Sequence, residues 1–171
     1  MTAFTRLAPT VGSGDDVAHG ASAEMASAGR PFTPLLVTDL VTGGVVLAPT
    51  TLHAGVSSLD DDEVPRPEPF EVPPATADLV NRTRHRGGRV VAVATTVTRA
   101  LEAVSDDDGR VAPGRGWTDL VLCPRRPARV VDGLVTGWHA PRASHLRLLE
   151  AVAGRGMVER AYEAALARSY L

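Results

Sequence analysis

The feature that most constrains the fold of this sequence is a regular alternation of short apolar runs with helical stretches. The clearest apolar run, at residues 89–94, leads directly into a helical stretch that begins at Thr95. Strands that alternate with helices in this way predict an α/β fold with a mostly parallel sheet. Apolar spacing, caps and Gly or Pro signals predict helices at 34–42, 74–86, 95–104, 144–154 and 158–168, and strands at 45–48, 89–94, 120–123 and 130–135.

The number of expected strands limits the architecture. About five strands are too few to close an eight-stranded barrel. The sequence therefore predicts an open sheet or a partial, barrel-like parallel sheet with flanking helices, which would be an incomplete domain. Residues 1–20 show no sustained periodicity and are interpreted as a loop or disordered segment, whereas residues 21–171 form the domain. The segment 60–69 combines an acidic run with three prolines and is interpreted as a surface loop.

Composition and charge argue against several classes of protein. The formal net charge of −2 is not that of a strongly basic nucleic-acid binder, so any RNA contact must come from a local patch. A single cysteine, Cys123, excludes an internal disulfide and a zinc site built from several thiolates. No apolar stretch approaches the ~20 residues of a membrane span, and the N-terminus lacks the order of a signal peptide. We expect a cytoplasmic protein with no membrane partner and no bound metal.

A series of segments in fixed order resembles one enzyme family. Residues 51–56 read Thr-Leu-His-Ala-Gly-Val, and residues 87–102 contain the run Val-Ala-Val-Ala-Thr-Thr-Val-Thr-Arg-Ala-Leu-Glu. The full series comprises residues 22–33, 51–56, 87–102, 117–119, 131–136 and 139–144. Together these segments resemble the S-adenosylmethionine:tRNA ribosyltransferase-isomerase family of queuosine biosynthesis, over most of the chain.

The resemblance implies a specific chemistry. The family transfers the ribosyl portion of S-adenosylmethionine onto 7-aminomethyl-7-deazaguanine in the tRNA anticodon. It then isomerises this unit to give epoxyqueuosine, with release of adenine and methionine. S-Adenosyl-L-methionine is therefore a consumed ribosyl donor, and tRNA is the second substrate. Such a reaction needs a base near the ribosyl 5′ carbon and hydrogen-bond donors around the departing adenine.

The departures from the family pattern indicate a divergent member. The Leu-His that precedes a Phe in the family is Arg30-Pro31 here, and a Gly before the Thr-Thr pair is Ala94. A motif with two histidines keeps only Glu68, and an Asn is replaced by Gly137. Family members are about twice as long, and their N-terminal half supplies the rest of the barrel. The resemblance thus identifies residues 21–171 as a C-terminal catalytic half, whose partner would be a complementary N-terminal half or a second copy.

Three residues are the candidates for catalysis. His53 precedes Ala54-Gly55, where a ligand can approach the backbone closely, and it could act as a base or hydrogen-bond donor. His139 lies in a rigid Gly-Trp-His-Ala-Pro turn, and Glu68 lies in the proline-rich loop as a potential mobile acid or base. Each histidine could equally be a structural polar group.

The candidates for substrate binding lie around two strand ends and are Thr95, Thr96, Arg99, Glu102 and Asp132. Thr95, Thr96 and Arg99 come where a parallel strand meets the next helix, a position at which α/β folds bind ligands. The helix N–H groups there suit the methionine carboxylate of the donor. The alternative is a pair of capping threonines and an ion pair between Arg99 and Glu102. Asp132, next to a strand, could contact ribose hydroxyls or could stabilise a turn.

Two basic stretches are the candidate RNA contacts, at residues 82–86 and 125–129. Neither contains aromatic residues, so neither offers a platform on which a base could stack. Solvated surface is the alternative interpretation. Trp138 could stack on a base or pack in the core.

Three hypotheses follow for the whole chain. The first is the transferase-isomerase acting on tRNA. The second is a truncated, inactive fragment that only binds a partner or RNA. The third is an unrelated α/β nucleotide-binding enzyme, against which stands the absence of a Gly-rich phosphate loop after a strand.

Overall fold

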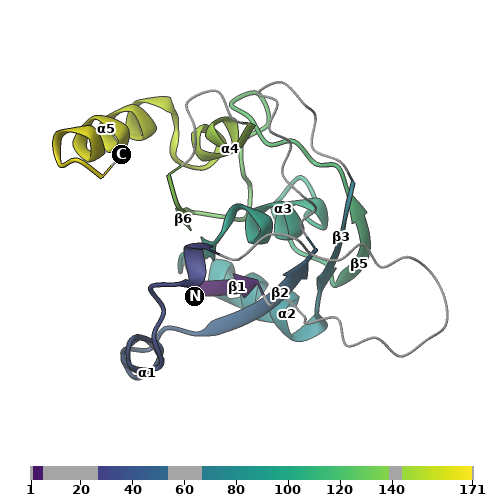
Figure 1. The fold of residues 1–171 in the computed structure, drawn as a ribbon. Helices are drawn as coiled ribbons and strands as arrows, with labels where there is room; N and C mark the ends of the chain where they lie inside the picture. The colour runs from purple at the N-terminus through teal and green to yellow at the C-terminus, as the bar shows by residue number, and fades with distance from the viewer. Residues whose placement is uncertain (1, 6–26, 54–66, 139–143, 171) are drawn as a thin grey trace, which may run out of the picture.

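The computed structural model describes residues 2–5, 27–53, 67–138 and 144–170. Its described part contains a six-stranded sheet in the order β5-β3-β2-β1-β4-β6 (Figure 1). The strands are β1 (Thr2–Thr5), β2 (Leu47–Leu52), β3 (Glu68–Val72), β4 (Val91–Val93), β5 (Gly114–Thr118) and β6 (Gly133–Val135). The helices are the short η1 (Ser27–Gly29), then α1 (Pro34–Thr42), α2 (Pro74–His85), α3 (Thr95–Ala103), α4 (Ser144–Ala153) and α5 (Arg155–Ala167).

The sheet is parallel on one side and antiparallel on the other. Strand β1 pairs in parallel with both β2 and β4, and β4 pairs in parallel with β6. The pairs β2–β3 and β3–β5 are antiparallel. The predicted α/β class is confirmed, and β3 and β5 add an antiparallel edge that the sequence did not indicate.

Three predictions about local structure were wrong. The segment 1–20 is not loop throughout, because residues 2–5 form the strand between β2 and β4, and four residues are too few to show periodicity. Glu68 and Pro69 belong to β3 rather than to a loop. Pro69 fits in the strand because it only accepts there, from the N–H of His53 at 2.9 Å.

The expected strand at 120–123 is the third error. Leu120 and Leu122 are buried against Leu148 and Ala151 of α4, so their apolar alternation reflects packing and not sheet pairing. The strand lies just before it, in the Gly-rich β5, where pairing with β3 overrides a weak intrinsic preference.

The helices agree with the prediction within a few residues. Thr33 caps α1 by accepting the Leu36 N–H at 3.2 Å, and Pro34 follows at the first helical position. The last helix begins earlier than expected, at Arg155, directly after Gly154. Within the described residues, no helix is long and apolar enough to cross a membrane.

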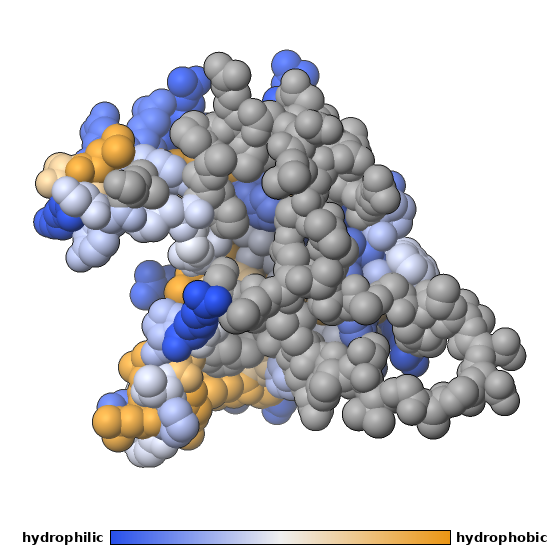
Figure 2. Space-filling view, viewed as in Figure 1, coloured by the Kyte–Doolittle hydropathy of each residue, from blue (hydrophilic) through white to orange (hydrophobic). Residues whose placement is uncertain are grey.

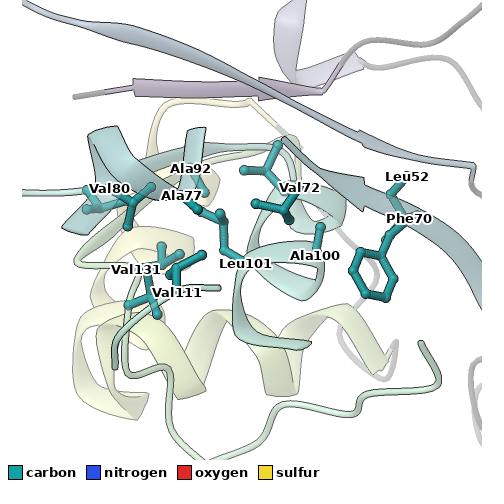
Figure 3. Packing of buried hydrophobic residues seen from close by; sticks show 13 residues of the cluster. Leu52, Phe70, Val72, Ala77, Val80, Ala92, Ala100, Leu101, Val111 and Val131 are labelled. Atoms are coloured by element: carbon teal, nitrogen blue, oxygen red, sulfur yellow. The ribbon is translucent and has the colours of Figure 1, made fainter. Parts of the chain in front are cut away.

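The main core lies between the sheet and the helices α2 and α3. Leu52, Phe70 and Val72 from β2 and β3 meet Val80 of α2 and Leu101 of α3 (Figure 3). Because side chains alternate along a strand, the intervening residues point to the other side of the sheet.

The other side of β2, β3 and β5 is called the open face here. Along these strands it carries Pro49, Thr51, Pro69, Glu71, Arg115 and Trp117. Pro49, Glu71, Arg115 and Trp117 are exposed, whereas their neighbours on the helix-covered face are buried or half-buried. The two faces of the same three strands therefore have different environments.

Candidate functional site

The junction between β4 and α3 combines a strained backbone with the start of a helix. Ala94 adopts φ 89° and ψ 150°, a conformation that is nearly restricted to glycine, and its N–H donates to the Val135 carbonyl at 2.9 Å. Ala94 is the N-cap and makes no side-chain capping bond, so the alternative in which Thr95 or Thr96 is the N-cap is wrong. Both threonines lie in the first turn, with Thr95 buried and Thr96 half-buried. The first N–H groups of α3 thus lie at the carboxyl ends of the parallel strands.

Arg99 is bonded to three other residues of the chain. Its guanidinium forms an ion pair with Glu68 of β3, Nε donates to the Leu120 carbonyl at 3.1 Å, and Nη2 donates to the Thr118 carbonyl at 3.2 Å. The residue is only 9% exposed. These contacts tie α3 to β3 and to the segment after β5.

Glu68 is held by this contact and is not on a mobile loop. Its side chain is 17% exposed and faces α3, together with Phe70. His53 lies across from Pro69, to which its N–H donates, and alternation places its side chain on the open face. The structure therefore does not bring His53 and Glu68 together.

Glu102 accepts hydrogen bonds from three consecutive backbone N–H groups. Its carboxylate oxygens lie 2.8–3.1 Å from the nitrogens of Arg129, Val130 and Val131. The residue is 5% exposed. Contacts to a carboxylate are stronger than those between neutral groups, so Glu102 fixes the segment that leads into β6. It does not pair with Arg99 in the described contacts.

Asp132 has a similar role at the next position. Its Oδ2 accepts the Val90 N–H at 2.8 Å, and its own N–H donates to the Val90 carbonyl at 2.8 Å. This pair of bonds aligns the beginnings of β4 and β6. Thr50 and Thr98, by contrast, have buried hydroxyls with no hydrogen-bond partner in the described structure.

The two basic stretches are partly engaged with the protein itself. Arg84 Nη1 donates to the Val130 carbonyl at 3.1 Å, and Arg82 lies 3.8 Å from Asp78 on the preceding turn of α2. Both line an open groove of about 480 Å³ between α2 and residues 108–110. Arg129 forms an ion pair with Asp107 at 3.0 Å. These partners reduce the number of cations available to phosphate.

His139 lies outside the described residues. Trp138 contacts the ring of Tyr162 in α5 edge-on, with centroids 5.0 Å apart. Among the described residues, no group of three or more His, Cys, Asp or Glu side chains could hold a metal ion.

Comparison with known proteins identifies the family. The family described as "Queuosine biosynthesis protein" matches residues 17–171, nearly the whole chain. The chain belongs to this family. The S-adenosylmethionine:tRNA ribosyltransferase-isomerase of Natranaerobius thermophilus is 39% identical over 151 residues, and that of Symbiobacterium thermophilum is 41% identical over 156 residues. The predicted resemblance is confirmed.

These queuosine-family relatives are much longer than the matched region. The two matches cover 84% and 87% of this chain but only 44% and 46% of the relatives. A crystal structure of the S-adenosylmethionine tRNA ribosyltransferase of Thermotoga maritima is similar, with 36% identity and a TM-score of 0.66. The structural match covers 82% of this chain and 46% of the Thermotoga maritima chain. This partial coverage agrees with the predicted incomplete domain.

From the sequence alone, neither Arg115 nor Trp117 is assigned a role in the site, although residues 117–119 belong to the series that resembles the family. Arg115 and Trp117 lie on the open face of β5, and Trp117 is 68% exposed. The available signal was the alternation Arg-Gly-Trp, which places both side chains on one side of a strand. The apolar pattern instead predicts a strand at residues 120–123, which leaves this alternation outside the expected sheet.

Proposed function

We propose that this chain carries the C-terminal part of a domain that transfers and isomerises the ribosyl group of S-adenosylmethionine. The acceptor is 7-aminomethyl-7-deazaguanine in tRNA, and the product is epoxyqueuosine. The observation that carries this proposal is the match over residues 17–171, with 39–41% identity to relatives named for this activity. We propose that the protein acts in the cytoplasm, because tRNA is its proposed substrate.

The donor is proposed to bind at the start of α3. The N–H groups of the first turn and the Thr95 and Thr96 hydroxyls suit the methionine carboxylate, as an anion at a helix N-terminus. Arg99 supports this turn from within through its bonds to Glu68 and to the carbonyl groups of Thr118 and Leu120. It is therefore a positioning residue, and donor binding rests on the threonines.

His53 is the proposed base. It follows β2, next in the sheet to β1, and no side-chain partner is recorded for it among the described residues. A neutral imidazole can accept the proton that leaves the ribosyl carbon beside the sulfonium. His139 is the alternative base. Glu102 and Asp132 are proposed to hold the backbone and not the substrate, because the protein's own N–H groups occupy their carboxylates.

A complementary part of the family fold is proposed to cover α1. This helix has no buried residue, although its sequence is largely apolar. Leu35 is 72% exposed, Val41 52% and the nearby Val46 45%, and Figure 2 shows this apolar surface gathered over α1. Exposed apolar patches of this kind mark interaction surfaces. Because the matched region is under half of the relatives' length, the remaining part of that fold is the occupant that we propose.

The activity is tested by adenine release. The chain is incubated with S-adenosylmethionine and tRNA that bears the deazaguanine precursor, with the Thermotoga maritima relative as the positive control. Adenine and methionine should appear in equal amounts with modified tRNA. The experiment is repeated after addition of the part of the relative that this chain does not match. If the tRNA stays unmodified in both experiments while the control reacts, the result supports the inactive-fragment hypothesis instead.

A further inference from the structure

Trp117 is a large aromatic side chain without an evident structural role. It is 68% exposed on β5, the edge strand of the sheet. Its position pairs with Pro69 of β3, and no ring partner is recorded for it among the described residues. Trp138 differs, because it is 46% exposed and contacts the ring of Tyr162. The sheet does not need the Trp117 indole, which leaves a ring face accessible.

Arg115 lies on the same side of the same strand, two residues before Trp117. Its position pairs with Glu71, and both side chains are exposed. Within the described part of the chain, Arg115 has no recorded ion pair, in contrast to Arg82, Arg99 and Arg129. A guanidinium of this kind is available for an external phosphate.

We propose that Trp117 and Arg115 form a platform for an unpaired RNA base, which stacks on the indole while its phosphate contacts the guanidinium. Successive side chains on one face of a strand are about 7 Å apart, so a single nucleotide can contact both. Aromatic stacking combined with a nearby cation is the usual way to bind single-stranded nucleic acid. The proposal rests on the proposed function, since that function supplies the tRNA.

The surroundings favour RNA over a protein partner. The core of a protein interface is a contiguous apolar patch with few charges. On the open face, the neighbours of Trp117 are the half-buried Pro69 and the charged Glu71 and Arg115. A single aromatic ring among polar groups can stack a base, but it offers little area to an apolar protein surface. Neither basic stretch at 82–86 or 125–129 contains such a ring.

Intrinsic fluorescence can test this platform directly, because the chain contains two tryptophans. In Trp138→Phe, Trp117 is the only tryptophan, and in Trp117→Phe the only tryptophan is Trp138, so excitation selective for tryptophan over tyrosine reports on one indole in each protein. Each protein is titrated with a tRNA anticodon stem-loop, and with a fully paired RNA duplex of equal length, without S-adenosylmethionine. We expect saturable quenching by the stem-loop in Trp138→Phe and no saturable change in Trp117→Phe.

Filter binding of the same stem-loop gives the affinities. Trp117→Ala should weaken binding about 5- to 150-fold, and Trp117→Phe should retain most of the affinity because phenylalanine still stacks. Arg115→Ala should lower the slope of log K against log salt by about 0.7. Trp138→Ala is the matched control and should change the affinity less than twofold.

Two results would overturn the platform. One is the absence of quenching in Trp138→Phe together with unchanged affinity in Trp117→Ala. The other is a self-associated chain that Trp117→Ala converts to monomers, with RNA binding intact, which would make Trp117 a protein contact. Adenine release reports on the proposed function separately: activity without any Trp117 effect contradicts only the platform, and quenching without activity contradicts only the enzyme assignment.

Discussion

The charged side chains in and next to α3 differ in burial from the side chains on the open face of the sheet. Glu68, Arg99 and Glu102 are nearly buried, and each bonds to other parts of the chain. Arg115 and Trp117 are exposed, and no such partners are recorded for them among the described residues. A buried charge needs its partners to offset the loss of hydration, so the contacts of these three residues stabilise the fold. An exposed, unpaired group is available to a ligand.

The largest effect is expected at Glu102. Glu102→Ala would leave the N–H groups of residues 129–131 without their acceptor, and those of Val130 and Val131 are buried. We expect a loss of about 3–5 kcal/mol in the free energy of unfolding, measured by urea denaturation. Glu163→Ala, at an exposed glutamate of α5, is the matched control and should change it by less than about 0.5 kcal/mol. Equal effects of the two substitutions would mean that the Glu102 carboxylate does not stabilise the fold.

A smaller but coupled effect is expected at the Arg99–Glu68 pair. Arg99→Met removes the charge and retains most of the volume, and it should cost about 3 kcal/mol because the nearly buried Glu68 loses the Arg99 guanidinium. Combining it with Glu68→Gln should recover part of this loss. A double-mutant cycle should give a coupling free energy of about 1–3 kcal/mol. Additive effects would mean that the pair does not hold β3 to α3.

The two helix starts at Ala94 and Gly154 offer a test of backbone strain. Ala94 has φ 89° and ψ 150°, and Gly154 has φ 77° and ψ 148°, so an alanine and a glycine share one conformation. A Cβ added at Gly154 would meet no atom within 4 Å, so Gly154→Ala isolates the backbone cost. Gly154→Ala should destabilise by about 1–2 kcal/mol, and Ala94→Gly should stabilise by up to about 1 kcal/mol. If Ala94→Gly destabilises the chain, the alanine methyl contributes packing that outweighs the strain.

The smallest effect on stability is expected on the open face. Trp117→Ala and Arg115→Ala should each change the free energy of unfolding by less than about 0.5 kcal/mol, because neither side chain is buried. Thermal melts beside Glu102→Ala provide the check. A loss above about 2 kcal/mol in the free energy of unfolding of either variant would mean that this side chain stabilises the fold.

Local signals made much of this architecture predictable. The cap at Thr33, the prolines at 34 and 74 and the glycines after α1 and α2 indicate helix ends directly. Strands β1 and β5 depend on pairing with segments distant in sequence, which no local pattern reveals. The same limit applies to the site, because the backbone N–H groups that donate to Glu102 lie 27–29 residues further along the sequence. The family motif marked Glu102 without showing whether it faces the protein or a ligand.

Buried, bonded side chains stabilise the fold, whereas His53 is proposed as the catalytic base. Substitution of His53 separates the two roles. Adenine release and thermal unfolding are measured together for the unmodified chain and for His53→Ala, under the conditions in which the unmodified chain, or the chain with the relative's unmatched part, is active. We predict an unchanged melting temperature and a loss of about 10²-fold or more in the rate of adenine release, as for removal of a general base. Adenine release at the original rate in a folded His53→Ala protein would contradict the account.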